Sequence, residues 1–400
     1  MEHNLQLAEQ GILHVYNRFP ILLDHGEGVY LYDTDGKKYL DFAAGFAVSA
    51  LGYGNPRFNQ ALKDQIDQLM HTSNLYFHEA GAKAADSLNH VTGMDRVFFT
   101  NSGSEAIEGA LKVARKYAWA KGSKKTEIIA FEHSFHGRTL GSLSITGHTP
   151  YREPFEPLIP GVTFAEFNNL EHVQSLASEE TCAIIVEPLQ GEGGINLCGA
   201  EFLQGLRNLC DKLDILLIFD EIQCGMGRTG VMFAHQMFGV KPDILVIAKG
   251  IGNGFPVGAF AMTQQVADAS LKPGDHGTTY GGNPLACVAI HTVLEIFEDE
   301  QIVEHVQEVG LYLKDRLDAL ATEYDCVVGR RGIGLMQGIE LSVPAGEVNQ
   351  LTLKEGLLVI QAQGNVIRFV PPLIIEKAHI DEMIVMIKKV LDTFEFLSHN

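Results

Sequence analysis

Two short apolar runs, Ile215–Phe219 and Ile244–Ala248, constrain the fold of this chain more than any other feature. Each run is too short for a helix and shows no alternation of apolar and polar residues, which is typical of a strand buried on both faces of a parallel sheet. Asp220 directly follows the first run, and Lys249 directly follows the second. Because ligands bind at the carboxyl ends of the strands in open α/β sheets, we expect this acid and this amine to face one crevice.

The pairing of Asp220 with Lys249 indicates a particular cofactor chemistry. Desolvation beside a buried strand lowers the pKa of a lysine and makes its amine a nucleophile. Such lysines form Schiff bases with carbonyl compounds, including pyridoxal phosphate (PLP), whose ring acts as an electron sink when an acid lies beside its pyridinium nitrogen. Each residue alone has an ordinary alternative, a turn cap for Asp220 and a solvated strand end for Lys249. Their joint position before the glycine-rich turn Gly250–Gly254 favours the cofactor hypothesis.

Composition restricts the class of protein. The formal net charge of −20 leaves no basic excess to neutralise phosphates, which argues against nucleic-acid binding. The six cysteines form no C-x-x-C pair, and the first residues lack the basic and apolar regions of a signal peptide. We therefore expect reduced thiols and a cytoplasmic location. No apolar run approaches the length of a membrane span, so we expect no membrane partner.

The order of predicted elements indicates two domains. From residue 73 to residue 290, helical patterns alternate with short apolar strands, which predicts a doubly wound α/β domain. The long segment 132–160 in this part is expected to be a loop. Beyond residue 290 the pattern changes to an α+β domain that the N-terminal arm completes. The expected strands of that domain are 334–341, 357–361 and 366–369. We divide the chain into a large domain, residues 55–290, and a small domain, residues 1–54 and 291–400.

A serine- and glycine-rich segment, Asn101–Ala106, lies between an expected strand and a long helix. The small residues Ser102, Gly103 and Ser104 leave backbone N–H groups free at the helix N-terminus, which is an arrangement that binds phosphate. An ordinary N-cap by one of the serines is the alternative. Because we expect the crevice to bind a phosphorylated cofactor, we favour the phosphate site over the ordinary N-cap.

The loop that follows strand 128–131 carries an aromatic and a basic candidate. Phe135 is placed to stack on an aromatic cofactor, and Arg138 to bind a carboxylate with its two-pronged guanidinium. Core packing for Phe135 and a surface ion pair for Arg138 are the alternatives. His133 and His136 form an H-x-x-H pair, but no third ligand lies nearby in the sequence, so we expect no metal.

Further candidates lie on loops and in one late strand. Glu187–Gly194 follows a strand, and its carboxylates either gate a site or belong to a solvated loop. Arg368 is expected within a strand, where a buried cation is costly unless it is paired. Its partner is either a substrate carboxylate or Glu192. The segment His276–Pro284 donates to a phosphate or simply leads into the next helix.

Five segments together resemble the class III (subgroup II) PLP-dependent aminotransferases of fold type I. They are N-S-G-S-E-A, S-F-H-G-R-T, F-D-E-I-Q-C-G-M-G-R-T-G, the A-K-G strand end and H-G-T-T-Y-G-G-N-P. The resemblance runs from about residue 15 to the C-terminus. It implies a large, mostly parallel α/β domain with a smaller α+β domain, PLP as cofactor, and a homodimer with a shared active site.

Within that family the chain is most similar to the acetylornithine branch. This implies transfer of the terminal amino group of N2-acetyl-L-ornithine to 2-oxoglutarate, a step of arginine biosynthesis. Ornithine, succinylornithine and 4-aminobutyrate are the alternative amino donors. A PLP-dependent mutase or decarboxylase, and a non-catalytic PLP-binding regulator, are alternatives from other classes.

The resemblance also implies roles for the cofactor-binding residues. Lys249 corresponds to the Schiff-base lysine, and Asp220 to the partner of the pyridine nitrogen; these two are the expected catalytic residues. Gln223 corresponds to a residue on the hydroxyl side of the ring, and Phe135 to the stacking ring. Thr279 is expected to bind the phosphate from the other subunit. The full expected set is Ser102, Gly103, Ser104, Phe135, Asp220, Gln223, Lys249 and Thr279.

The substrate-binding residues follow from the same resemblance. Arg138 corresponds to the arginine that binds the α-carboxylate of the donor, and Thr278 lies near the substrate. Glu192 and Arg368 correspond to a switch pair. The two bind each other during the donor half-reaction and separate so that Arg368 binds the α-carboxylate of glutamate.

Overall fold

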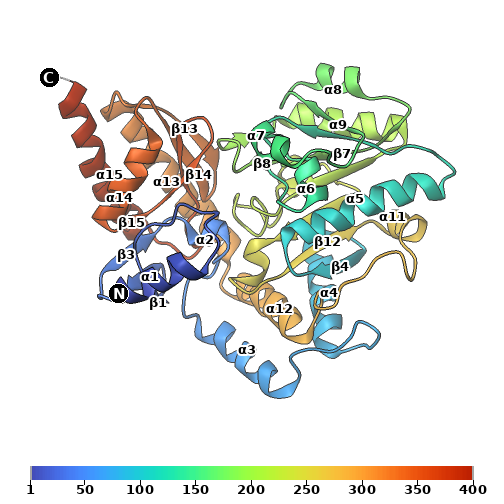
Figure 1. Ribbon diagram of the computed structural model, residues 1–400, viewed down its shortest axis with the longest axis horizontal. Helices are drawn as coiled ribbons and strands as arrows, with labels where there is room; N and C mark the ends of the chain where they lie inside the picture. The colour runs from blue at the N-terminus through green and yellow to red at the C-terminus, as the bar shows by residue number, and fades with distance from the viewer. Residues whose placement is uncertain (1, 399–400) are drawn as a thin grey trace.

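A computed structural model describes residues 2–398. The chain forms two lobes (Figure 1). One lobe holds a seven-stranded sheet with its covering helices, and the other holds the strands and helices of the N- and C-terminal segments.

The large sheet is built around the two apolar runs. Its strand order is β4-β12-β11-β10-β7-β5-β6. β10 (Leu216–Asp220) lies parallel to β11 (Ile244–Ala248) on one side and to β7 (Thr181–Val186) on the other. All residues of these three strands are buried, as expected for strands covered on both faces. The other strands are β4 (Arg96–Thr100), β5 (Glu127–Phe131), β6 (Val162–Ala165) and β12 (Gly258–Met262).

Helices cover both faces of this sheet and divide the core in two. Leu216 and Ile218 pack with α5 (Gly103–Ala120) in one cluster, whereas Leu217 and Phe219 join a second cluster on the opposite face. This alternation confirms the predicted doubly wound α/β domain. Helices that pack on the second cluster are α4 (Glu79–Thr92), α8 (Leu170–Leu176), α9 (Ala200–Leu213), α10 (Ala234–Phe238) and α12 (Pro284–Asp299), while α11 (Gln264–Ala269) lies beside α5.

The pattern of the sequence did not predict β12, which runs antiparallel to both of its neighbours, β11 and β4. Its residues, GAFAM, include a glycine and two alanines, which have low strand propensity. Ala259 and Ala261 face the core cluster on the side of the sheet opposite α5, whereas Phe260 and Met262 face α5. A Cβ atom added at Gly109 of α5 would lie 2.1 Å from the ring of Phe260 in β12. The other pairings of neighbouring strands in this sheet are parallel. The sheet is therefore mostly parallel, in agreement with the expected fold class.

The second lobe joins the two ends of the chain. Hairpin strands β2 (Tyr30–Asp33) and β3 (Lys38–Asp41) share a sheet of order β1-β2-β3-β15 with β15 (Leu357–Leu358), in which Leu357 pairs with Leu40. A second sheet has the order β13-β14-β17-β16. The pairing of Leu357 with Leu40 supports the domain division that we propose. The boundary of that division, residue 290, lies inside α12. The further elements are β1 (Leu23–Glu27), β13 (Val327–Ile333), β14 (Met336–Leu341), β16 (Ile360–Ala362), β17 (Val366–Phe369), α13 (Ile302–Glu323), α14 (Ala345–Glu355) and α15 (Lys377–Ser398).

Two sequence predictions were wrong in detail. The expected strand 357–361 is interrupted at Val359, and its halves, β15 and β16, belong to different sheets. The expected loop 132–160 contains α6 (Leu140–Ser144), α7 (Thr149–Arg152) and the 3-10 turn η1 (Glu153–Phe155), which are too short to give a periodic pattern. The remaining short elements are α2 (Ala44–Ala47), β8 (Leu189–Gln190), β9 (Asn196–Leu197) and the 3-10 turn η2 (Lys249–Gly252).

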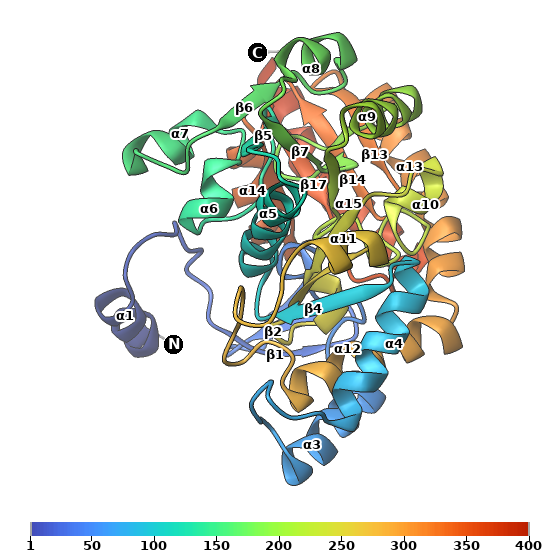
Figure 2. The ribbon, with the colours of Figure 1, turned by 90° about the vertical axis from the view of Figure 1, so that its right-hand side faces the viewer.

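Near the N-terminus, α1 (Glu2–Gly11) stands away from the rest of the chain (Figure 2). Helix α3 (Pro56–Gln68) begins at Pro56, and its N-cap Asn55 accepts a hydrogen bond from the Phe58 amide. The apolar side chains of Ile66 and Leu69 are exposed. Across residues 2–398, no helix has both the length and the hydropathy that crossing a membrane requires.

Candidate active site

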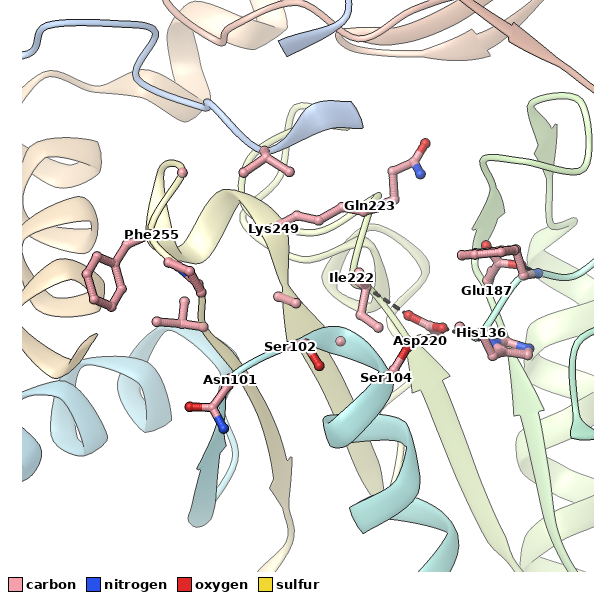
Figure 3. Close-up of a pocket in the computed structure, with 18 residues that line it drawn as sticks. Asn101, Ser102, Ser104, His136, Glu187, Asp220, Ile222, Gln223, Lys249 and Phe255 are labelled. Carbon is pink, nitrogen blue, oxygen red and sulfur yellow. Dashed lines mark hydrogen bonds and ion pairs between the residues drawn. The ribbon is translucent and has the colours of Figure 1, made fainter. Parts of the chain in front are cut away.

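A cavity of about 310 Å³ opens where the carboxyl ends of β10 and β11 meet the N-terminus of α5. Lys249, Asp220 and Ser104 border this space from three different elements (Figure 3). The acid and the amine that the sequence placed at neighbouring strand ends thus line one cavity, because β10 and β11 are adjacent and parallel.

Lys249 follows β11 in a strained conformation. Its φ of 51° lies in the left-handed region, which is unfavourable for a residue with a side chain. Among the described residues, its amine has no hydrogen-bond partner. Desolvation lowers the pKa of Lys249, and the nearby Arg368 lowers it further, against the opposing charges of Glu192 and Asp220. The site therefore favours a neutral, nucleophilic amine.

Asp220 ends β10 and is held in place by two hydrogen bonds. Its Oδ1 accepts from the Ile222 amide at 3.0 Å, and its Oδ2 accepts from His136 Nδ1 at 2.7 Å. Burial alone lowers the pKa of His136, but the hydrogen bond and charge of Asp220 outweigh burial, so the pKa is raised. The buried His136 was considered in the sequence only as part of a metal pair. The S-F-H-G-R-T motif was the signal that could have identified it as a partner of Asp220.

Glu187 is a second buried carboxyl group beside the cavity. It follows β7, and its Oε2 accepts a hydrogen bond from the Phe135 amide at 3.1 Å. Burial raises the pKa of Glu187 to about 7, partly opposed by His136. Glu187 thereby fixes the backbone that carries the expected stacking ring, and Phe135 itself lines the cavity.

The N-terminus of α5 forms one wall of the cavity. Ser102 is the N-cap, and its hydroxyl accepts from the Glu105 amide at 3.3 Å. Ser102, Gly103 and Ser104 all line the cavity. A Cβ atom at Gly103 would lie 2.8 Å from Ile222, so the turn closely approaches the segment that follows β10. The backbone N–H groups of this first turn give the cavity an anion-binding wall.

Arg368 in β17 is completely buried, and the structure identifies its partner. Its Nη2 lies 2.9 Å from Glu192 Oε1, and its Nη1 donates to Gln223 Oε1 at 2.8 Å. Of the two partners that the sequence left open, the structure pairs Arg368 with Glu192. The same guanidinium also orients Gln223, which lines the cavity.

Five expected residues lie outside the walls of the cavity: Glu192 and Arg368, which form the ion pair described above, and Arg138, Thr278 and Thr279. Arg138 is exposed, and its guanidinium carbon lies 3.7 Å from the ring centroid of Tyr151. Thr278 accepts a hydrogen bond through its hydroxyl from Asn101, a lining residue that the sequence analysis did not select. Thr279 is exposed and does not reach the cavity of its own chain. Its expected role in another subunit stays a prediction.

The donor set fits PLP. A free amine, a buried carboxylate, an aromatic ring and an anion-binding helix N-terminus surround one cavity at the carboxyl edge of an α/β sheet. These groups match the aldehyde, the pyridine nitrogen, the ring face and the phosphate of the cofactor. The fold and the site thus define an enzyme of the class that holds a phosphorylated aldehyde on a lysine.

Comparison with known proteins identifies the family. The sequence model of the family Aminotransferase class-III matches residues 13–391, so the chain belongs to the class III aminotransferases. It is 45% identical to the acetylornithine aminotransferase of Aquifex aeolicus, over 95% of this chain and 99% of that protein. It is 46% identical to the acetylornithine aminotransferase of Clostridium acetobutylicum, over 94% and 97%. The crystal structure of the ornithine aminotransferase from Toxoplasma gondii superposes with a TM-score of 0.94 at 31% identity, over 98% and 95%.

Proposed function

We propose that this aminotransferase moves the terminal amino group of N2-acetyl-L-ornithine to 2-oxoglutarate, giving N-acetyl-L-glutamate 5-semialdehyde and L-glutamate. The observation that carries the proposal is the unpartnered amine of Lys249 in the same cavity as Asp220 and the N-terminus of α5. The two acetylornithine aminotransferases that match nearly the whole chain support the choice of donor. The reaction is a step of arginine biosynthesis.

PLP is the cofactor of this reaction, and it supplies an electrophilic carbon and an electron sink when bound. We assign its phosphate to the backbone of Ser102–Ser104 and its ring face to Phe135. Asp220, oriented by His136, holds a proton on the ring nitrogen. The Lys249 amine, whose pKa is lowered by burial, is suited to form the covalent bond and to move a proton at the carbon that bears the transferred nitrogen.

We assign the substrate carboxylates to two arginines. Arg138 binds the α-carboxylate of the amino donor, with Thr278 near the substrate. Glu192 neutralises Arg368 while that donor is bound, and separation of the pair frees Arg368 for the α-carboxylate of glutamate. The 2.9 Å ion pair supports this assignment, since a fully buried guanidinium needs a carboxylate at all times.

The proposed assembly is a homodimer in which Thr279 of one subunit reaches the phosphate of the other. The exposure of Thr279, together with that of the neighbouring Tyr280 and of the apolar Leu75 and Phe77, supports a second copy on this surface. Cys182, Cys198, Cys210, Cys224 and Cys287 are buried free thiols, which supports the reducing cytoplasmic location expected from the sequence.

The test is a visible spectrum of the purified protein with PLP. N2-acetylornithine, ornithine and 4-aminobutyrate are added separately, without 2-oxoglutarate. We expect N2-acetylornithine to bleach the yellow colour fastest and 2-oxoglutarate to restore it. Faster bleaching by another amine would overturn the choice of donor alone. A protein that takes up no PLP would overturn the assigned site as well.

A further inference from the structure

The guanidinium of Arg138 rests on aromatic rings. Its central carbon lies 3.7 Å from the ring centroid of Tyr151 and 5.4 Å from that of Phe135. Within residues 2–398, the guanidinium has neither a carboxylate partner nor a side-chain hydrogen bond. Contacts between a cation and the face of a ring are therefore what fix its direction before a substrate arrives.

Tyr151, in α7, is itself held by a neighbouring ring. His148 contacts it edge to face, with centroids 4.1 Å apart and planes at 69°. The amide of Gln363 lies 3.0 Å from His148 Nδ1 through its nitrogen and 3.2 Å from His133 Nδ1 through its oxygen. Because one end of an amide donates and the other accepts, His148 Nδ1 accepts here and carries no proton.

The charge state of His148 suits this position. Desolvation lowers its pKa, and the positive charges of His133, Arg138 and Arg152 lower it further. A neutral His148 imidazole beside Tyr151 does not repel the Arg138 guanidinium. The contact between that guanidinium and the Tyr151 ring therefore remains attractive.

Gln363 also connects the contacting rings of Tyr151 and His148 to Arg368. Gln363 belongs to the small lobe, and its backbone N–H donates to the Glu192 carbonyl at 3.0 Å. The Glu192 carboxylate in turn binds Arg368. One residue thus links the ring stack beneath Arg138 to the loop that carries the partner of Arg368.

We propose that Tyr151 is a positioning residue for substrate specificity, whose ring aims Arg138 at the carboxylate of the amino donor. The proposal rests on the role assigned to Arg138 under the proposed function. Tyr151 acts through the face of its ring, so a phenylalanine replaces it and an aliphatic side chain of similar size does not.

The test compares Tyr151→Phe, Tyr151→Leu and Tyr151→Met in the donor half-reaction. The reaction is monitored as the loss of the yellow colour of the PLP-loaded enzyme. The donors are N2-acetylornithine and N-acetylputrescine, which lacks only the carboxylate. Loss of a cation–π contact should raise the apparent Kd for N2-acetylornithine by about 3- to 30-fold in the two aliphatic variants, with the limiting rate unchanged. Tyr151→Phe should behave like the parent enzyme, and all variants should treat N-acetylputrescine alike. Tyr151→Met serves where the leucine variant does not fold.

Two outcomes would overturn the proposal. Equal losses with both donors would mean that Tyr151 only supports the fold, and a loss in Tyr151→Phe as large as in Tyr151→Leu would mean that the hydroxyl matters rather than the ring. In an Arg138→Ala background, Tyr151→Leu should cause no further loss, and an additive loss would contradict a role through Arg138. The proposed function fails separately, if the parent enzyme itself does not convert N2-acetylornithine.

Discussion

The Oδ2 atom of Asp220 lies 2.7 Å from His136 Nδ1, and both side chains are buried. Asp220 ends β10, whereas His136 lies in the loop after β5, 84 positions away in the sequence. The histidine supplies a charge-assisted hydrogen bond that keeps the carboxylate in one orientation. The charge on this wall of the cavity is therefore set by Asp220 together with His136, not by Asp220 alone.

Replacement of His136 by glutamine should weaken this pair. Loss of a hydrogen bond to a charged group costs about 1.5–3 kcal/mol, so we expect the donor half-reaction to slow by roughly 10- to 100-fold and PLP to bind less tightly. Stopped-flow bleaching and PLP titration measure the two effects. His90→Gln, on the exposed side of α4, is the control. Parent-like rates in His136→Gln would show that Asp220 needs no partner.

Lys249→Ala should abolish turnover while leaving the rest of the cavity in place. The change removes the amine that forms the covalent bond and moves the proton, and loss of general acid–base catalysis alone costs about 10²- to 10⁴-fold in rate. Single-turnover assays with saturating PLP measure this loss. The exposed Lys124→Ala should keep full activity. Parent-like turnover in Lys249→Ala would refute the assigned chemistry.

Glu187 should make the stability of the protein depend on pH. Burial raises its pKa from 4.5 to about 7, so the neutral form favours the folded state. This contribution is fully present below about pH 4.5 and is lost as the pH rises through 7. Glu187→Gln keeps the group neutral, so its urea midpoint should match the parent near pH 5 and exceed it at pH 8, by roughly 2–3 kcal/mol in the free energy of unfolding.

The control for this comparison is Glu201→Gln, on the exposed side of α9. Its difference from the parent should stay constant between pH 5 and pH 8. If the Glu187→Gln difference were equally constant, the carboxyl group would not titrate in this range.

Glu192→Gln should change the balance between the two substrates. Without the Glu192 carboxylate, the positive charge of Arg368 is not neutralised while the amino donor is bound. We therefore expect kcat/KM for N2-acetylornithine to fall by about tenfold or more. The half-reaction with glutamate, for which Arg368 must be free, should be retained. Glu340→Gln is the matched control, since Glu340 forms a 2.6 Å ion pair with Arg331 outside the cavity. Equal losses for both substrates would exclude the switch.

Local patterns predicted the elements of the fold well where their signal was strong. The continuous apolar runs of β10 and β11 and the strand-end positions of Asp220 and Lys249 were sufficient to place an acid and an amine on one cavity. β12 was not predicted because its glycine and two alanines have low strand propensity, and its strand conformation depends on pairing with β11 and β4, which the local sequence does not report. The division at Val359 depends on which sheet each half joins, a property of the assembled lobe.

Contacts between distant residues were predicted less completely. Arg368 was expected to need a carboxylate, and Glu192 was one of two partners considered, because a buried cation must be neutralised. The bond between His136 and Asp220 was missed, since H-x-x-H spacing suggests metal ligands and gives no information on contacts across 84 positions. The exposed Arg138 and its contact with Tyr151 depend on the short helix α7, which leaves no periodic signal.

The pairing of β15 with β3 has a consequence for how the protein is made. Leu40 is synthesised early, and its partner Leu357 leaves the ribosome when most of the chain already exists. The large sheet, whose strands lie between Arg96 and Met262, can close before that moment, but the small lobe cannot. During synthesis, β3 therefore exposes an open edge. The ion pair of Glu192 and Arg368 also forms only when β17 has been made, so a chain that ends before this strand lacks the pair.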